Sequence, residues 1–290
     1  MYTEINKLYD RLMTAMGIED TGIPVSFIKF YFETDSIPAE VTERHIDEVS
    51  LTSCQATRQA SLGDAVCISG NNIGCIAAAI TFGLVDMNDK NPLEKPRVYT
   101  EIMRNQLNNK TDFTPPSPSD FTEGLVYACK DSGRRDFCLF GQEDSGRFKD
   151  VATAKFAVSQ MTALQPAKTK AVFFYSTTFD LLDIEPDVVV FNARPVELTK
   201  LIQSYQYLTG KRVAANMGGL RAVNSDLIVR PYVTQEINIS SYCLGSRIIA
   251  NYEANRMGIG IPLNRFKEVV EGAEKSKTGY PFNHYPGVIV

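Results

Sequence analysis

The sequence predicts a protein of the α/β class, more closely described as mixed α+β, in which a sheet has flanking helices. Segments with helical periodicity alternate with short segments of strand type along the 290 residues. Hydrophobic residues make up 44% of the chain and charged residues 22%, so a sizeable core is available. No repeat of solenoid period is visible. We therefore expect a sheet with helices packed against it.

The first half of the chain opens with a predicted helix over 4–17, where apolar residues recur at helical spacing and Gly17 ends the pattern. A strand follows at 24–32, then a helix that begins near Cys54, a strand at 65–69 and a helix that opens at Cys75 and ends at Gly83. A further helix is predicted at 97–107, and the Pro-rich segment 114–119 is the candidate boundary between lobes.

The second half begins with a predicted helix over about 151–161. Strands are predicted at 171–175 and 186–191, and the loop that starts at Asn192 leads into a helix running to Tyr207 and is available for ligand contact. The segment 213–219 is predicted to be a short strand or a buried turn, followed by a helix at 220–230 or an extended run that ends at Pro231. The remaining elements are a strand at 236–242, a helix after Cys243, a strand or loop at 258–262 and a helix at 263–275.

Two lobes are one reading of this organisation. Residues 1–115 would form an N-terminal lobe with two cysteine-bearing helices, and residues 116–290 a C-terminal α/β lobe with the third. A single large domain is the alternative, since 290 residues lie within reach of one α/β unit.

The net charge, the apolar runs and the first residues of the chain exclude several classes of function. A net charge of −4 does not favour a surface that coats nucleic acid or a membrane. No apolar run approaches the ~18 residues that a transmembrane helix needs, and the first residues do not resemble a signal peptide. We expect a cytoplasmic protein without nucleic-acid or membrane partners, and homo-oligomerisation stays open. Only two histidines occur, which disfavours zinc enzymes and catalytic triads that need histidine.

A repeated arrangement of cysteine and arginine suggests the chemistry. Cys54 and Cys243 each come after Ser or Thr and before an apolar helical run, and each is followed four residues later by an arginine, Arg58 or Arg247. Cys75 likewise precedes an apolar helical run. All three cysteines are expected at helix N-termini, where unpaired N–H groups and the helix dipole favour a thiolate. Thiolates without a histidine pattern point first to iron–sulfur chemistry.

The hypothesis is a [4Fe–4S] cluster bound by Cys54, Cys75 and Cys243. Three ligands would leave one iron open as a Lewis acid, which favours lyase, hydratase or desulfidase chemistry over electron transfer. Arg58 and Arg247 are the candidate catalytic residues, because a guanidinium binds a small anionic substrate through paired hydrogen bonds. Cys67, Cys129 and Cys138 are expected in the core, and of these Cys129 is the most plausible fourth ligand because a polar turn follows it.

Three alternatives stay open. The cysteines could be buried packing residues, with the arginines paired to acidic groups. The chain could be a non-catalytic module that binds a small molecule or anion, or a metal-free thiol enzyme with Cys54 or Cys243 as nucleophile.

Weaker candidates lie elsewhere in the chain. These are Glu253 and Asp187 as acid or base, Asn192 and Asn216 as amides that orient a ligand, and the glycines of 217–219 and 258–260, which either form turns or let the backbone approach a ligand.

Four segments together resemble a known family. They are residues 53–58, 74–84, 185–191 and 243–247, and the resemblance covers about residues 25–275. The chain is similar to the domain of unknown function 169 family of archaea and bacteria. The resemblance implies a family frequent in anaerobes, which is compatible with an oxygen-sensitive metal site, but it implies no settled activity.

Overall fold

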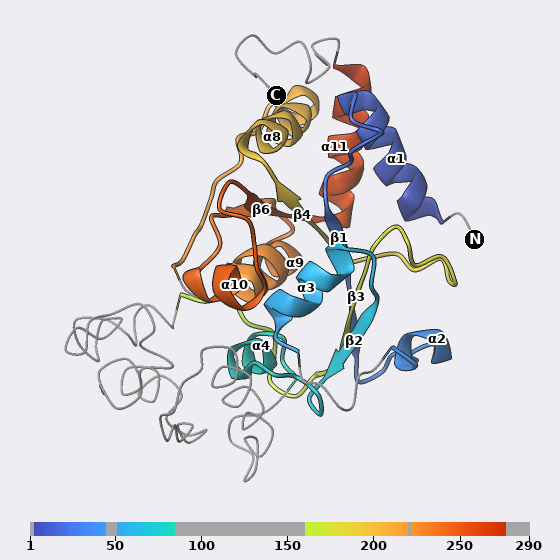
Figure 1. Ribbon diagram of the computed structural model, residues 1–290, viewed down its shortest axis with the longest axis vertical. Helices are drawn as coiled ribbons and strands as arrows, with labels where there is room; N and C mark the ends of the chain where they lie inside the picture. The colour runs from blue at the N-terminus through green and yellow to red at the C-terminus, as the bar shows by residue number, and fades with distance from the viewer. Residues whose placement is uncertain (1–2, 45–50, 85–159, 220–221, 277–290) are drawn as a thin grey trace, which may run out of the picture.

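A six-stranded antiparallel sheet lies at the centre of the computed structural model, which describes residues 3–44, 51–84, 160–219 and 222–276 (Figure 1). The strand order is β2-β3-β1-β4-β6-β5. The predicted mixed α+β class is confirmed. The strands are β1 (Val25–Phe32), β2 (Val66–Ser69), β3 (Thr169–Tyr175), β4 (Val188–Ala193), β5 (Asn238–Ser240) and β6 (Met257–Pro262).

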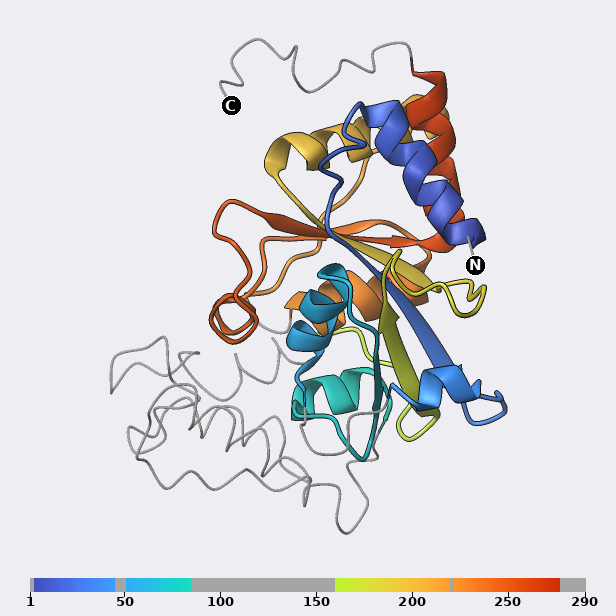
Figure 2. The same cartoon turned by 45° about the vertical axis from the view of Figure 1, so that its right-hand side comes forward.

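Helices cover both faces of this sheet (Figure 2). One face carries α1 (Glu4–Met16), α8 (Pro195–Thr209) and α11 (Leu263–Lys275). The other carries α3 (Ser53–Ser61), α4 (Ile76–Thr81), the π-helix η3 (Ala222–Val229) and α9 (Arg230–Thr234). Helix α10 (Leu244–Ile249) packs against α3, and the short α2 (Ala39–Thr42) contacts β2.

The alternation of side chains along each strand produces two apolar cores, one on each face of the sheet. Phe27 and Phe173 belong to the core under α1, α8 and α11, whereas the next residues, Ile28 and Phe174, belong to the core under α3 and α4. All six residues of β4 are buried, which explains why the sequence around 186–191 is almost continuously apolar.

Helix capping follows from the sequence at the elements that matter for the site. The Thr52 hydroxyl oxygen accepts a hydrogen bond from the backbone N–H of Gln55, and the Gln55 side-chain oxygen accepts one from the backbone N–H of Thr52, so α3 begins with a capping box. Gly17 adopts the left-handed conformation with φ 69° and ends α1 where the sequence predicts.

The predicted strands all occur, and so do the predicted helices that fall within the described residues, with two differences. Residues 213–219 have no regular secondary structure and are mostly exposed, so the predicted strand or buried turn is wrong. The helix predicted at 220–230 is a π-helix, and it continues through Pro231 into α9 instead of stopping there. Cys129, Cys138, the helix at 97–107 and most of 151–161 lie outside the described residues.

The predicted lobe boundary near residue 115 also lies outside the described residues. Strands from both sides of it, such as β1 and β3, pair in one sheet. None of the described helices combines the length and the apolar character needed to cross a membrane.

Two glycines of β6 allow the π-helix to pack closely on the sheet. A Cβ atom on Gly260 would collide with the carbonyl oxygen of Leu227, and one on Gly258 would collide with the Leu227 side chain. The glycines therefore serve the approach of η3 to β6, and the predicted turn or ligand approach at 258–260 is replaced by this contact.

Candidate functional site

The three cysteines lie at helix N-termini, as the sequence predicts. Cys54 is the second residue of α3, Cys75 is the N-cap of α4 and Cys243 is the N-cap of α10. Cys54 and Cys243 are half-buried, whereas Cys75 is buried in the core on the α3 side of the sheet. The sulfur of Cys243 accepts a hydrogen bond from the backbone N–H of Ser246 at 3.4 Å, so this thiol caps its own helix.

The cysteines do not form a recognisable metal site in the described part of the chain. No group of three or more His, Cys, Asp or Glu residues there is placed to hold a metal ion. Cys67 lies inside β2, where burial raises the pKa of its thiol to about 12. Cys67 is buried in the core, as the sequence predicts.

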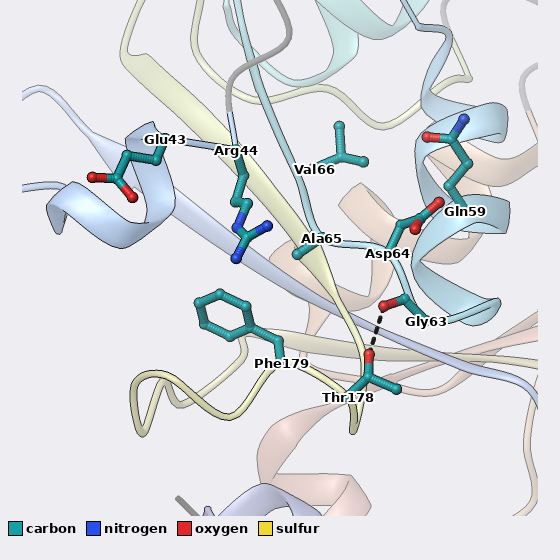
Figure 3. A pocket seen from close by; sticks show the side chains of 9 residues that line it. All are labelled: Glu43, Arg44, Gln59, Gly63, Asp64, Ala65, Val66, Thr178 and Phe179. Carbon is teal, nitrogen blue, oxygen red and sulfur yellow. Dashed lines mark hydrogen bonds between the residues drawn. The ribbon is translucent and has the colours of Figure 1, made fainter.

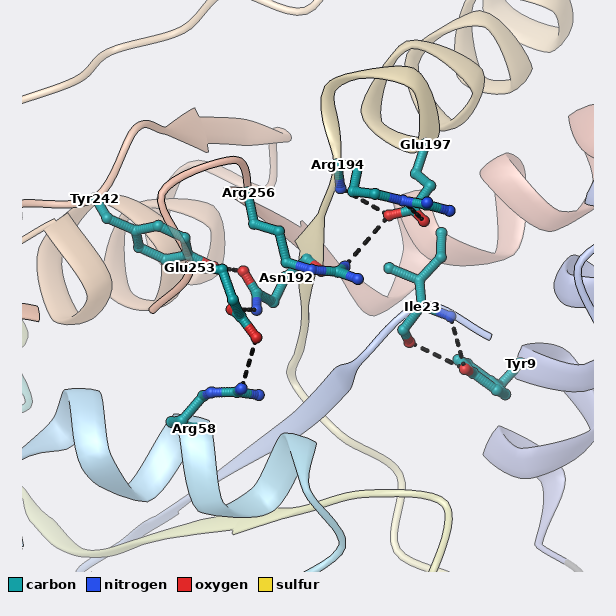
Figure 4. A network of polar contacts seen from close by, with 9 residues as sticks. All are labelled: Tyr9, Ile23, Arg58, Asn192, Arg194, Glu197, Tyr242, Glu253 and Arg256. Carbon is teal, nitrogen blue, oxygen red and sulfur yellow. Dashed lines mark hydrogen bonds and ion pairs between the residues drawn. The ribbon is translucent and has the colours of Figure 1, made fainter. Parts of the chain in front are cut away.

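The two cysteine–arginine segments meet at Glu253, in the loop between α10 and β6. Arg58 donates from Nη2 to Oε1 of the Glu253 carboxylate at 2.7 Å (Figure 4). Arg247 donates from Nη1 to the Glu253 carbonyl oxygen at 2.5 Å, and from Nη2 to the carbonyls of Ser241 and Arg256. One residue thus joins two segments that are 189 positions apart in the chain.

Asn192, at the end of β4, connects this loop to the sheet. Its amide nitrogen donates to Oε2 of Glu253 at 2.9 Å, and its amide oxygen accepts from the hydroxyl of Tyr242 at 2.9 Å. Arg256 donates to the Asn192 carbonyl oxygen at 2.7 Å. The Asn192 amide thus binds Glu253 in this structure, and its role in orienting a ligand stays a prediction.

Two stacked tyrosines fill the space between the cysteine–arginine segments. The rings of Tyr242 and Tyr252 lie 4.2 Å apart with an interplanar angle of 24°, and the guanidinium of Arg247 lies 5.5 Å from the Tyr242 ring centre. The hydroxyl of Tyr252 donates to the carbonyl of Cys54 at 3.4 Å. Burial raises the pKa of both tyrosines, so both act as neutral donors.

A second carboxylate, Glu197, lies beside the first at the start of α8. It is 1% exposed and accepts from Arg194 Nε at 2.6 Å and from Arg256 Nη1 at 3.4 Å. It also caps α8, because it accepts the backbone N–H of Arg194 at 2.7 Å.

We call this set of hydrogen-bonded and stacked residues the Glu253 cluster. It joins four guanidinium groups and two carboxylates through Asn192 and the tyrosine pair, and its members are Arg58, Arg194, Arg247, Arg256, Glu197, Glu253, Asn192, Tyr242 and Tyr252.

The carboxylate of Glu253 is stabilised in its charged form. Burial is the largest single influence and acts to raise the pKa of Glu253. The hydrogen bond from Asn192 and the charges of Arg58 and Arg256 together outweigh burial and hold this pKa below its ordinary value of 4.5. Glu253 is thus a poor general base near neutral pH and a good partner for arginine.

The remaining candidates named from the sequence lie away from the Glu253 cluster or serve the fold. Asp187 binds Lys29 at 3.1 Å and the backbone N–H of Phe30 at 2.7 Å, and burial raises its pKa. Asn216 exchanges two hydrogen bonds with Asn238, which hold the 213–219 segment beside β5. Glu197 and Arg256 were not predicted as site residues, because single charged residues in loops carry no motif.

Comparison with known proteins places the chain in a family. An uncharacterized protein of Methanocaldococcus jannaschii is 26% identical over 139 residues, which are 48% of this chain and 58% of that relative. No solved structure matches the chain. The model of the domain of unknown function 169 family, described as uncharacterised ArCR, matches residues 22–272 and so most of the chain, including α3, the β4–α8 loop and α10. The chain belongs to this family, DUF169.

Proposed function

We propose that the chain binds a small anionic molecule, a carboxylate or a phosphate, at the Glu253 cluster. The observation that carries the proposal is the charge imbalance: four guanidinium groups face two carboxylates. Arg58 and Arg256 are 17% and 19% exposed, so their charges are partly removed from water. An excess of positive charge in such surroundings favours an anion.

Arg247 is the guanidinium that best fits a ligand. Within the described residues it forms no ion pair with a carboxylate, and its hydrogen bonds go to carbonyl oxygens. Those bonds fix its position without neutralising its charge. Arg58, in contrast, is already paired with Glu253.

The test is a thermal-shift titration of the full chain with inorganic phosphate and, separately, with acetate. We expect a saturable rise in Tm for the wild type, as ligand binding stabilises the native state. The rise should be lost in Arg247→Ala and reduced in Arg58→Ala. It should persist in Arg11→Ala, a control whose arginine pairs with Glu274 and with no member of the cluster.

A second substitution protects the test against loss of folding. Glu253→Gln removes one negative charge while keeping the shape of the side chain, so phosphate should bind more tightly than to the wild type. Equal Tm shifts in the wild type and Arg247→Ala, with no gain in Glu253→Gln, would overturn the proposal.

The [4Fe–4S] cluster on Cys54, Cys75 and Cys243 stays a prediction. Their positions at helix N-termini agree with it, while the absence of a metal-holding group among the described residues does not favour it. We derive no reaction step from it. Anaerobic reconstitution followed by iron analysis tests it directly: about four irons per chain are expected if the cluster forms, and iron-free protein would end the hypothesis.

The other predictions from the sequence depend on these results. Lyase, hydratase or desulfidase activity requires the iron–sulfur result. A thiol enzyme requires that Cys54 or Cys243 alone reacts rapidly with iodoacetamide near neutral pH. We also propose a cytoplasmic location, which is independent of these results.

A further inference from the structure

A cavity lies where the end of α2, the turn between α3 and β2, and the loop after β3 meet (Figure 3). Its volume is ≈ 600 Å³, within the range of sites that hold small molecules. The side chains that give it chemical character are Arg44, Gln59, Asp64, Val66 and Phe179. None of them belongs to the Glu253 cluster.

The walls of this cavity are held by hydrogen bonds between distant segments. The hydroxyl of Thr178 donates to the carbonyl of Gly63 at 2.6 Å and ties the loop after β3 to the turn after α3. The backbone N–H of Cys67 donates to the carbonyl of Arg44 at 3.1 Å and ties the end of α2 to β2. The backbone N–H of Asp64 donates to the carbonyl of Gln59 at 3.1 Å. The cavity is therefore formed before any ligand arrives.

Charges of opposite sign stand apart across this cavity. Figure 3 shows the guanidinium of Arg44 on one side of Ala65 and the carboxylate of Asp64 on the other. Within the described residues, neither side chain forms an ion pair with the other or with a third residue. Glu43 adds a second carboxylate to the lining. A ligand that carries both a negative and a positive group would satisfy Arg44 and Asp64 together.

The lining also includes an apolar surface. Val66 and Phe179 are 2% and 5% exposed, so they present only edges of well-packed side chains to the cavity. The amide of Gln59 adds one acceptor and one donor group beside Asp64. A small zwitterion would place its carboxylate at Arg44, its ammonium group at Asp64 and its apolar portion against this surface.

We propose that this cavity binds a small zwitterion, a free α-amino acid or a dipeptide. Its carboxylate pairs with Arg44, its ammonium group faces Asp64 and Gln59, and its apolar portion lies against Val66 and Phe179. Guanidinium–carboxylate recognition supplies the orientation, and the acidic wall rejects ligands that lack a cationic end. The site is independent of the anion proposed for the Glu253 cluster.

The experiment is isothermal titration of the full chain with each standard L-amino acid and with glycylglycine, at millimolar concentration. At least one of them should bind. Its N-acetyl derivative, which lacks the ammonium group, and its amide, which lacks the carboxylate, should each bind about tenfold more weakly or worse, since each loses one charge-assisted contact.

Substitutions assign the binding to the cavity. Arg44→Ala and Asp64→Asn should each weaken the amino acid about tenfold, and Arg212→Ala, which removes an exposed arginine outside the cavity, should leave it unchanged. Arg247→Ala should also leave it unchanged, which separates this proposal from the anion site. The proposal fails if no amino acid or dipeptide binds, if the blocked derivatives bind equally well, or if Arg44→Ala and Asp64→Asn have no effect.

Discussion

The ion pair between Arg58 and Glu253 should stabilise the fold more than an exposed ion pair of similar length does. The nitrogen and oxygen lie 2.7 Å apart, and the side chains are 17% and 38% exposed. The pair joins α3 to the loop before β6, and Asn192 holds the second carboxylate oxygen. Lys168 and Glu33 provide the control, since they lie 3.0 Å apart but are 55% and 54% exposed.

The expected magnitude follows from exposure. Two unit charges about 4 Å apart near a protein surface attract by about 4 kcal/mol at an effective dielectric constant of about 20. Partial exposure of Glu253, the cost of removing both groups from water and the loss of side-chain freedom reduce this value strongly. We expect a coupling free energy of about 1–2 kcal/mol for Arg58 and Glu253, against about 0.5 kcal/mol or less for Lys168 and Glu33.

The assay is a double-mutant cycle by urea denaturation at pH 7. One cycle uses Arg58→Ala, Glu253→Ala and the double variant, and the other uses Lys168→Ala, Glu33→Ala and their double variant. Salt at 1 M should abolish most of the control coupling and leave part of the first, because partly buried charges are screened less. Equal couplings in the two cycles would refute the view that Glu253 ties the cysteine–arginine segments together.

Three further predictions test the packing and the buried acids. Gly260→Ala should lower the free energy of unfolding by about 1–3 kcal/mol, because its Cβ would collide with the Leu227 carbonyl. Gly219→Ala, whose Cβ meets open space, should change it by less than about 0.5 kcal/mol, and urea denaturation measures both. Cys67 should resist iodoacetamide at pH 8 in the native protein, because burial raises the pKa of its thiol to about 12, and it should react after unfolding. Mass spectrometry measures the labelling, and rapid labelling of the native protein would contradict the burial of Cys67. Burial raises the pKa of Asp226 from 3.8 to about 7, so between these values the folded state holds a proton that the unfolded state has lost, and the free energy of unfolding should fall as the pH rises from about 4 to about 7. Asp226→Asn should remove this slope in a pH series of denaturation curves, and an unchanged slope would exclude Asp226 as its source.

The elements that the sequence predicted correctly are those whose patterns are local. Side-chain alternation over 24–32 and the apolar run at 186–191 reflect burial of each strand on the sheet, and these patterns need no distant partner to be read. Capping residues such as Thr52 mark helix starts in the same way. Strand order could not be predicted, because β1 pairs with β3 and β4, whose residues come more than 130 positions later.

The π-helix and the 213–219 segment show where local patterns fail. Polar residues of η3 are buried and bound by distant groups, as when Asn224 donates to Thr81 at 2.8 Å, so its geometry depends on tertiary contacts. The apolar start of 213–219 suggests burial. Hydrogen bonds from Asn238 instead hold the backbone of Asn216 beside β5 and leave most of the segment exposed.

At the candidate site, too, the sequence spacing is local, whereas the contacts of each arginine depend on the tertiary fold. These contacts decide which arginine should bind an anion. The repeated spacing identified Arg58 and Arg247 as a related pair, but it could not show what each one contacts. The partner, Glu253, reaches them because β4 and β6 pair from Asn192 to Gly258, which brings the loop before β6 beside the end of β4. Arg58 then meets a carboxylate of its own chain, whereas Arg247 meets carbonyl oxygens and keeps its charge. An arginine that is already neutralised gains less from a ligand than one that is oriented and uncompensated. Loss of Arg247 should therefore weaken anion binding more than loss of Arg58.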